Sequence, residues 1–278
     1  MTADRIRARR PGPTLRTQVT EHREGSSTRR EDRLATEEPL ELRMGWPRHP
    51  PRRIWVTMRT PGHDFELAAG YAVNDGLIRP GDLRTVAYCT DVDLSPEEEF
   101  NVVTLTLTEQ PLRDPGHRHT LLGAGSACGV CGKDTIAAVL DVPRAGPWSG
   151  PLPTPQIVRR LPALLRDQQT TFARTGGVHA AGLFDHDGRA LAIREDVGRH
   201  NAVDKVIGTR VLSGQPPAAA CLVVSGRAGF ELAQKAVAAG VGCLVSVGAP
   251  TSMSVQLARD AGLGLYGFTA PDRCVQYA

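Results

Sequence analysis

A weak internal repeat near the C-terminus restricts the fold more than any other feature of the chain. Cys221–Gly226 aligns with Cys243–Gly248, and each unit contains a short apolar strand, a glycine turn, a helix and a closing glycine. With residues 263–268 as a third strand, the order is β-α-β-α-β. Such crossovers are right-handed and produce a parallel sheet covered by helices. We therefore expect an α/β fold.

The first half of the chain predicts a smaller α+β layer. Alternating apolar residues indicate strands, and a proline-rich turn at 47–51 joins the first two of them. A helix is expected over residues 61–75. The expected strands of this layer cover residues 40–44, 54–58, 82–90 and 101–108.

Further elements are expected between these two units. Thr154-Pro155 is a favourable N-cap and first-turn pair for a helix. Asp185–Gly188 is a hairpin signal, and it lies between apolar segments at 178–184 and 190–194. We therefore predict a helix followed by a β-hairpin before the repeat begins.

The basic excess of the chain is concentrated near its N-terminus. Residues 1–35 hold nine Arg and five acidic residues, whereas the whole chain has a formal charge of +3. These residues show no hydrophobic period, so we expect a disordered tail. A nucleic-acid-binding arm is the alternative, but the rest of the chain lacks a basic face with interleaved aromatic residues.

Length and composition indicate one large domain or two modest ones. We expect a disordered Arg-rich tail at 1–35, a small α+β subdomain at 36–112, a cysteine-containing loop at 113–135 and an α/β domain at 136–278. Six Cys among 278 residues are too few for a disulfide scaffold. We find no apolar run of membrane-spanning length and no secretory signal, so we expect a cytoplasmic protein.

Cys128 and Cys131 form the first candidate site. Glycines follow both cysteines, and the next residues are expected to begin a helix, whose N-terminus stabilises a thiolate. Lys133 adds a positive charge. This setting suits a nucleophilic sulfur that attacks another sulfur, as in disulfide or persulfide exchange.

Other interpretations of the Cys pair are a structural zinc half-site and an incidental pair. A structural zinc site requires a second close pair of ligands, and none of the remaining cysteines has another cysteine near it in the sequence. A zinc nucleobase deaminase uses His-x-Glu and Pro-Cys-x-x-Cys, but Ala127 precedes this pair. The only His-x-Glu is His22-Arg-Glu24, in the N-terminal tail. We therefore expect no metal site.

A second candidate site lies on a helix expected from about residue 195 to 207, ending at Gly208. Helical periodicity places Asp196 and His200 on the face that turns toward the core. In the alternative interpretation, Asp196 caps the first turn of the helix and His200 is a buried core histidine. His179, on the preceding strand, is expected to point into the same cleft.

The third candidate site comprises the ends of the two repeat strands. Both strands lead into helix N-termini that bear small polar groups, where backbone N–H groups bind phosphate. Arg227 and Arg273 can add bidentate phosphate contacts. Helix capping is the alternative role of the polar residues, which are Ser225, Thr251 and Ser252.

Together these segments resemble the FdhD family, the accessory sulfurtransferases of formate dehydrogenase. The resemblance extends from about Glu38 to the C-terminus. It rests on Ser126–Lys133, Gly176–Ala181, Arg194–Lys205, Ser225–Arg227 and Ala249–Ser252.

The resemblance implies a cytidine-deaminase-like α/β core without deaminase chemistry. It also implies that sulfur passes from the persulfide of a cysteine desulfurase to the molybdenum bis-guanine-dinucleotide cofactor, before insertion into the client formate dehydrogenase. Cys128 would carry the persulfide, Cys131 would assist, and a homodimer would provide a wide cleft. The segment that binds the cofactor would be Phe268, Thr269, Ala270, Pro271, Asp272 and Arg273. Ala270 departs from the family pattern, in which a further Arg is common.

Two other functions remain open at this point. A dithiol–disulfide oxidoreductase would use the same Cys pair on generic disulfides and would not need the C-terminal anion sites. A molybdenum-cofactor chaperone that lacks enzymatic activity would function without either cysteine.

Overall fold

The computed structural model describes residues 11–90, 94–95, 98–115, 141 and 143–278. Its larger sheet has six strands in the order β12-β11-β10-β9-β7-β8. Strands β9, β10 and β11 are parallel neighbours, whereas β7 and β12 run antiparallel to the strands they pair with. These strands are β7 (His179–Phe184), β8 (Ala190–Asp196), β9 (Cys221–Val224), β10 (Cys243–Ser246), β11 (Gly264–Ala270) and β12 (Arg273–Gln276). The predicted β-α-β-α-β unit is confirmed.

Helices cover both faces of this sheet. On β9, Cys221 and Val223 face α3, while Leu222 and Val224 face the opposite helices, because successive side chains of a strand alternate between faces. Burial on both sides explains why the strand is a continuous apolar run. The helices that cover the sheet are α3 (Pro155–Arg166), α5 (Arg199–Leu212), α6 (Phe230–Ala238) and α7 (Ser252–Ala261). The short helix α4 (Thr170–Thr175) lies between α3 and β7 in the chain. Thr154 caps α3 as predicted, since its side chain accepts a hydrogen bond from the Ile157 N–H.

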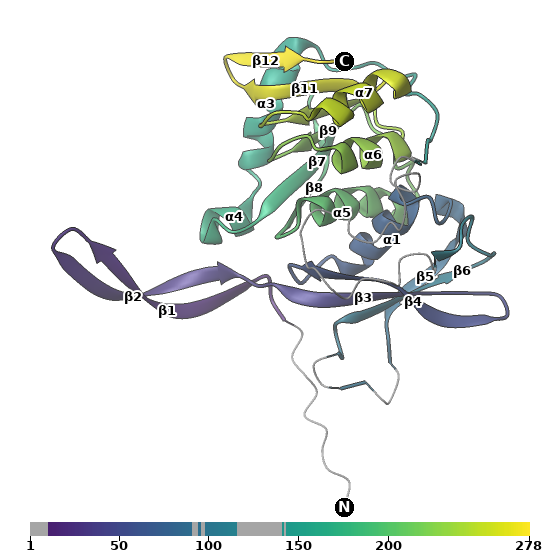
Figure 1. Ribbon diagram of the computed structural model, residues 1–278, viewed down its shortest axis with the longest axis horizontal. Coiled ribbons are helices and arrows are strands. Elements are labelled where there is room, and N and C mark those ends of the chain that lie inside the picture. Colours follow the sequence, from purple (N-terminus) through teal and green to yellow (C-terminus); the bar gives the residue numbers. More distant parts are fainter. Residues whose placement is uncertain (1–10, 91–93, 96–97, 116–140, 142) are drawn as a thin grey trace, which may run out of the picture.

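The first half forms a separate four-stranded sheet in the order β4-β3-β6-β5. Strands β3 and β6 are parallel, and the other neighbours are antiparallel. Helix α1 (Asp64–Asn74) lies between this sheet and α5 (Figure 1). The remaining elements are β3 (Glu38–Trp46), β4 (His49–Arg59), the 3₁₀ helix η1 (Pro80–Asp82), β5 (Leu83–Tyr88) and β6 (Val102–Leu107).

Two glycines bring α1 and α5 into direct backbone contact. A Cβ atom at Gly70 would lie 1.9 Å from the Asp204 carbonyl oxygen, and a Cβ at Gly208 would lie 1.8 Å from the Glu66 carbonyl oxygen. No larger residue fits at either position without separating the helices. This crossing joins the two sheet units into one core.

The expectation of a disordered tail is wrong for residues 14–35. They form an antiparallel hairpin of β1 (Thr14–Arg23) and β2 (Ser26–Ala35), which projects from the body as a long arm (Figure 1). Gly25, at φ 76°, supplies the turn. Arg16 and Glu31 form an ion pair across the strands. The segment has no hydrophobic period, but pairing between its two strands stabilises it. Its composition therefore gave a wrong prediction of disorder. Residues 1–10 lie outside the described residues.

The helix expected at 195–207 is also displaced. Strand β8 continues through Asp196, which pairs with His179 on β7, so α5 begins only at Arg199. The helix passes through Gly208 and ends at Leu212. A glycine within a helix usually weakens it, but here contact with α1 requires one. Among the residues that the structure describes, no helix is both long and apolar enough to span a membrane.

Candidate functional site

Cys128 and Cys131 lie outside the described residues, but the structure shows where the chain on either side of them is anchored. The Arg113 guanidinium lies 2.6 Å from the Asp141 carboxylate. The neighbouring Leu112 N–H donates to the Leu77 carbonyl, just beyond the end of α1. Arg113 and Asp141, which flank the cysteine-containing segment on either side, are therefore in direct contact.

The end of β9 brings Ser225 and Arg227 to the carboxyl edge of the large sheet. The Ser225 hydroxyl accepts a hydrogen bond from the Ala180 N–H at 2.9 Å, which ties β9 to β7. Arg227 is exposed. Its side chain lies against Gly248, where an added Cβ would be 3.0 Å from Arg227 Cγ. Glycine at 248 thus leaves room for an extended, accessible guanidinium.

Thr251 and Ser252 lie at the N-terminus of α7. The Thr251 hydroxyl accepts from the Ser254 N–H, and the Ser254 hydroxyl accepts from the Thr251 N–H, so a capping box holds Thr251. The alternative capping role is therefore present at this position. Ser252 is exposed in the first turn of the helix, where unpaired N–H groups and the dipole favour an anion.

The connection between β11 and β12 carries the predicted 268–273 segment. Phe268 has a positive φ of 48° and is 43% exposed, and the Arg273 guanidinium lies 5.5 Å from its ring centroid. Thr269 is buried, and its hydroxyl has no hydrogen-bond partner in the described structure. Ala270 pairs with Arg273 across the hairpin. Pro271 and Asp272 are exposed between them. An aromatic ring and a guanidinium are thus presented together at this edge.

Asp196 has a structural role in this arrangement. It is fully buried, and one carboxylate oxygen lies 2.6 Å from Lys205 Nζ and accepts from the Thr60 N–H. The other oxygen accepts from the Gly198 N–H and the Asn201 amide. These contacts hold the junction of β8 and α5 and give both carboxylate oxygens protein partners.

His200 and Glu231 form a pair that connects α5 with α6. His200 Nε2 lies 2.6 Å from Glu231 Oε2, and both side chains are largely buried. Glu231 Oε1 is buried and has no hydrogen-bond partner within the described part of the chain. Sequence reasoning missed Glu231, because nothing in its spacing links it to a histidine on another helix.

His179 lies beside this pair, at the start of β7. An added Cβ at Gly226 would be 3.7 Å from the His179 ring, so the ring lies next to the β9 edge. Burial lowers the pKa of His179 below its usual value, and the positive charge of Arg199 adds to this effect. The neutral ring is therefore favoured. In the described residues, no group of three or more His, Cys, Asp or Glu side chains is arranged to hold a metal ion.

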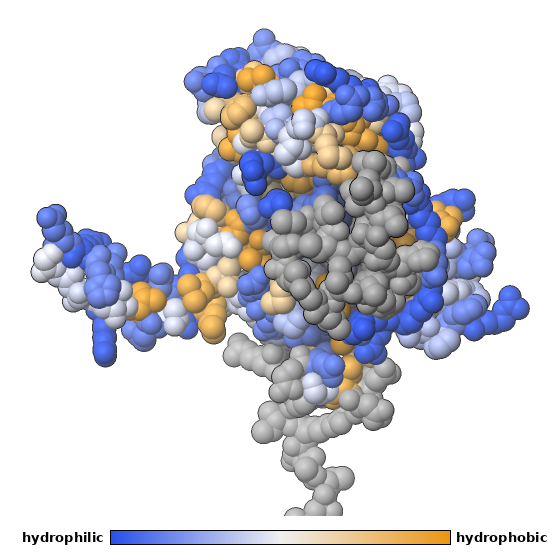
Figure 2. Space-filling view, viewed as in Figure 1, coloured by the Kyte–Doolittle hydropathy of each residue, from blue (hydrophilic) through white to orange (hydrophobic). Residues whose placement is uncertain are grey.

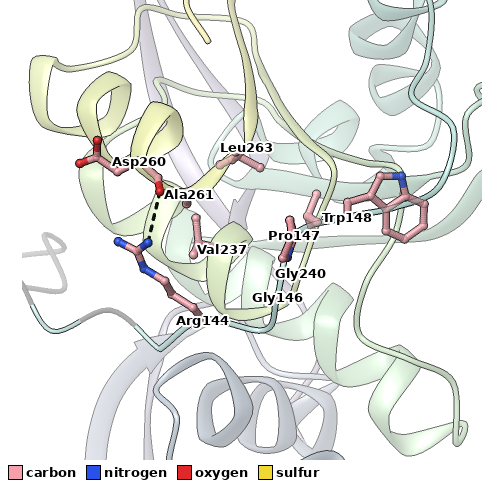
Figure 3. Close-up of a pocket in the computed structure, with 11 residues that line it drawn as sticks. Arg144, Gly146, Pro147, Trp148, Val237, Gly240, Asp260, Ala261 and Leu263 are labelled. Carbon is pink, nitrogen blue, oxygen red and sulfur yellow. Dashed lines mark hydrogen bonds between the residues drawn. The ribbon is translucent and has the colours of Figure 1, made fainter.

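A cavity of about 280 Å³ lies at another part of the sheet, near the C-terminal ends of α6 and α7 (Figure 3). The Arg144 guanidinium donates to the Asp260 carbonyl at its rim. Trp148, Val237 and Leu263 also line it. No described residue of the predicted sites lines this cavity, so it is separate from the carboxyl edge.

Comparison with known proteins identifies the group to which this chain is related. The model of the FdhD/NarQ family matches residues 35–278. The chain belongs to the FdhD/NarQ family. The resemblance inferred from its motifs is thus confirmed.

Relatives of the FdhD/NarQ family align over nearly the whole chain. The sulfur carrier protein FdhD of Nocardia farcinica is 44% identical over 92% of this chain and 89% of its own length. The protein of the same name from Streptomyces coelicolor is 43% identical over 92% and 90%. A crystal structure assigned as a formate dehydrogenase accessory protein of Desulfotalea psychrophila matches with a TM-score of 0.73 and 20% identity, covering 95% and 97%. The last comparison supports the mixed α/β fold.

The FdhD/NarQ match includes both predicted cysteines and the whole carboxyl edge. The structure brings Ser225, Arg227 and Ser252 to that edge with the Phe268–Arg273 hairpin. His179 and His200 lie near it, whereas Asp196 is turned inward.

Proposed function

We propose that the protein is a sulfur carrier that delivers sulfur for the maturation of formate dehydrogenase. The observation that carries the proposal is the 44% and 43% identity, over about nine-tenths of each chain, to proteins named sulfur carrier protein FdhD. The closely spaced Cys128 and Cys131 supply the sulfur chemistry. The donor would be a cysteine desulfurase, and the acceptor would be the molybdenum bis-guanine-dinucleotide cofactor, bound as substrate.

The first step loads Cys128. Its thiolate attacks the outer sulfur of the donor's cysteine persulfide. A bond forms between Cys128 Sγ and that sulfur, the sulfur–sulfur bond of the donor breaks, and the donor retains a thiolate. The proton stays on the transferred sulfur, so no oxidant or reductant is required.

The second step releases the sulfur to the acceptor. The Cys131 thiolate attacks Sγ of the persulfide on Cys128, forms a disulfide with it and expels hydrosulfide. The two thiols supply the two electrons that reduce the carried sulfur to sulfide. An external thiol then reduces the disulfide. The reducing cytoplasm, where we place the protein, suits this cycle.

The acceptor fits the carboxyl edge of the large sheet. Arg227 and Arg273 provide exposed guanidinium groups, which bind phosphate oxygens in bidentate geometry. The Phe268 ring offers a surface on which a guanine base can stack. Neutral His179 adds a polar group without adding charge. Two nucleotides need a wide surface, which a homodimer would provide.

The cytidine-deaminase-like description of the core belongs to the same proposal. Its support is the parallel β9-β10-β11 arrangement with helices on both faces. The chain lacks the Pro-Cys-x-x-Cys motif of zinc deaminases, which agrees with sulfur chemistry at the Cys pair.

Intact-mass measurement tests the loading step. Wild-type protein, Cys128→Ala and Cys131→Ala are each incubated with a cysteine desulfurase and cysteine. We expect wild type and Cys131→Ala to gain one sulfur that a reducing agent removes, and Cys128→Ala to gain none. A gain on Cys128→Ala equal to that of wild type would contradict the assignment. If wild type gained none from an active donor, the chaperone function would replace this one.

A further inference from the structure

A carboxylate oxygen without a partner lies at the end of the carboxyl edge that is formed by β7 and β8. Glu231 Oε1 is buried, and no described residue donates a hydrogen bond to it. The other oxygen, Oε2, accepts from His200 Nε2 at 2.6 Å. A buried acceptor that has lost water and gained no donor costs free energy. Oε1 is therefore suited to a donor on a bound molecule.

The Arg199 guanidinium is a donor without a partner at the same end of the edge. Arg199 begins α5 and precedes His200. Its side chain is partly exposed, and it forms no hydrogen bond or ion pair within the described part of the chain. The helix dipole disfavours a positive charge in the first turn, and α5 has no acidic residue there to offset it. The position of Arg199 therefore does not serve the stability of α5.

The His179 ring is close to Arg199 and His200. Burial, and then the charges of these two residues, lower the pKa of His179, so its neutral form is favoured. An added Cβ at Gly226 would lie 3.7 Å from the ring. Because Gly226 has no side chain, none covers the ring from that position. A neutral, flat ring of this kind offers a stacking surface to a nucleobase.

The unpartnered groups match the polar atoms of guanine. Guanine presents O6 and N7 as acceptors, which an Arg side chain binds in bidentate geometry. Its 2-amino and N1–H groups are donors, and a carboxylate oxygen accepts from them. Adenine has an acceptor at N1 and no 2-amino group, so it offers no donor to Glu231 there. The arrangement therefore favours guanine over adenine.

The place of these residues along the edge fits a nucleotide. In the strand order, β9 lies between the β7–β8 end and β11, so Arg227, just after β9, is exposed between His179 and the Phe268–Arg273 hairpin. The edge is the left side of the upper body in Figure 1, and Figure 2 shows hydrophilic and hydrophobic residues mixed along it. A base at Glu231 would direct its diphosphate toward Arg227. Phe268 remains for the second base of the acceptor.

We propose that Glu231, Arg199 and His179 form a guanine-binding site for one nucleotide of the acceptor. The inference rests on the proposed function, because that acceptor carries guanine nucleotides. Glu231 accepts from the 2-amino and N1–H groups, Arg199 donates to O6 and N7, and His179 stacks on the ring. The Glu231 side chain is 14% exposed and its terminal torsion is soft, so the carboxylate can turn Oε1 toward the base.

Two nucleotides that differ by one amino group test this site. Inosine diphosphate (IDP) is GDP without the 2-amino group. Binding is followed by NMR at the ring signals of His179, which are assigned by their loss in His179→Gln and report on this end of the edge. We expect wild type to bind GDP about tenfold more tightly than IDP, and ADP more weakly than either. Glu231→Gln should bind GDP and IDP with affinities within about twofold of each other.

Two further variants make the test independent of how well Glu231→Gln folds. Arg199→Gln removes a donor to O6 and N7, which GDP and IDP share. Both should therefore bind about tenfold more weakly, with the ratio of their affinities unchanged. Glu109→Gln is the matched control, because it changes an exposed carboxylate after β6 in the other sheet. Its affinities should equal those of wild type.

Other results would overturn the guanine site. Equal binding of GDP, IDP and ADP by wild type would show that the base is not read. A preference for GDP over IDP that persists in Glu231→Gln would show that Glu231 does not read it. Pyrophosphate that shifts the His179 signals at the same concentrations as GDP would assign the place to phosphate. Loading of Cys128 is measured separately, so its failure in a protein that prefers GDP would contradict the proposed function alone.

Discussion

Replacement of Gly208 by Ala should destabilise the whole molecule, because it acts at the contact between its two sheet units. The new Cβ would lie 1.8 Å from the Glu66 carbonyl oxygen and 2.6 Å from its carbonyl carbon. The opposing atoms belong to backbone, which cannot rotate away as a side chain can. The two helices must therefore separate by about 1.6 Å to restore an ordinary contact of 3.4 Å.

The expected magnitude follows from two opposing effects. Overpacking of this kind costs about 3 kcal/mol, and the greater helix propensity of alanine returns about 1 kcal/mol. The net loss of about 2 kcal/mol corresponds to a decrease of roughly 4–8 °C in Tm for a domain of this size. Urea unfolding followed by circular dichroism measures the free energy, and a thermal scan measures Tm.

Gly81→Ala is the control for this substitution. Nothing lies within 4 Å of a Cβ at Gly81, so its stability should stay within about 0.5 kcal/mol of wild type. If Gly208→Ala were as stable as wild type, or more stable, the close helix crossing would be refuted.

Three further predictions follow from other contacts. Lys205→Met should cost about 3–5 kcal/mol in urea unfolding, because it leaves the Asp196 carboxylate buried without its cation; a loss below about 1 kcal/mol would contradict the buried pair. Burial opposes ionisation of Glu66, but hydrogen bonds from Arg194 and His63 prevail and lower its pKa from 4.5 to about 2. The stabilisation from this group is present above pH 4.5 and is lost as pH falls toward 2, so Arg194→Met should flatten the decline in stability across that range. GDP represents a fragment of the acceptor, and calorimetry measures its binding. Arg273→Ala should weaken GDP binding about tenfold, whereas Arg174→Ala should leave it unchanged.

The elements that could be predicted from sequence are those whose signals are local. Strands β9 and β10 were predicted because each is an apolar run that ends in a glycine turn. The start of α3 was predicted because Thr154 and Pro155 form its cap and first turn. The β1–β2 arm was missed because cross-strand pairing, such as Arg16 with Glu31, stabilises it, and composition does not report such pairs.

The predicted site was less accurate where contacts are distant in sequence. Helical periodicity placed Asp196 on a helix, but pairing with His179 extends β8 through it. Its carboxylate then turns inward to Lys205 and to Thr60, which is 136 residues away. The contact of His200 with Glu231 likewise joins two helices that only folding brings together. The place of Arg227 just after β9, by contrast, could be predicted, because parallel strands place their carboxyl ends at one edge. Phe268 was expected only from the family resemblance.

Transfer of labelled sulfur tests the central claim most directly. The carrier is loaded on Cys128 with sulfur-34, freed of donor, and mixed with inactive formate dehydrogenase that contains its molybdenum cofactor. We predict that formate oxidation appears in proportion to the sulfur-34 lost from the carrier, and that Cys128→Ala supports none. Full activation by Cys128→Ala, or activation while the label stays on the carrier, would contradict a sulfur carrier.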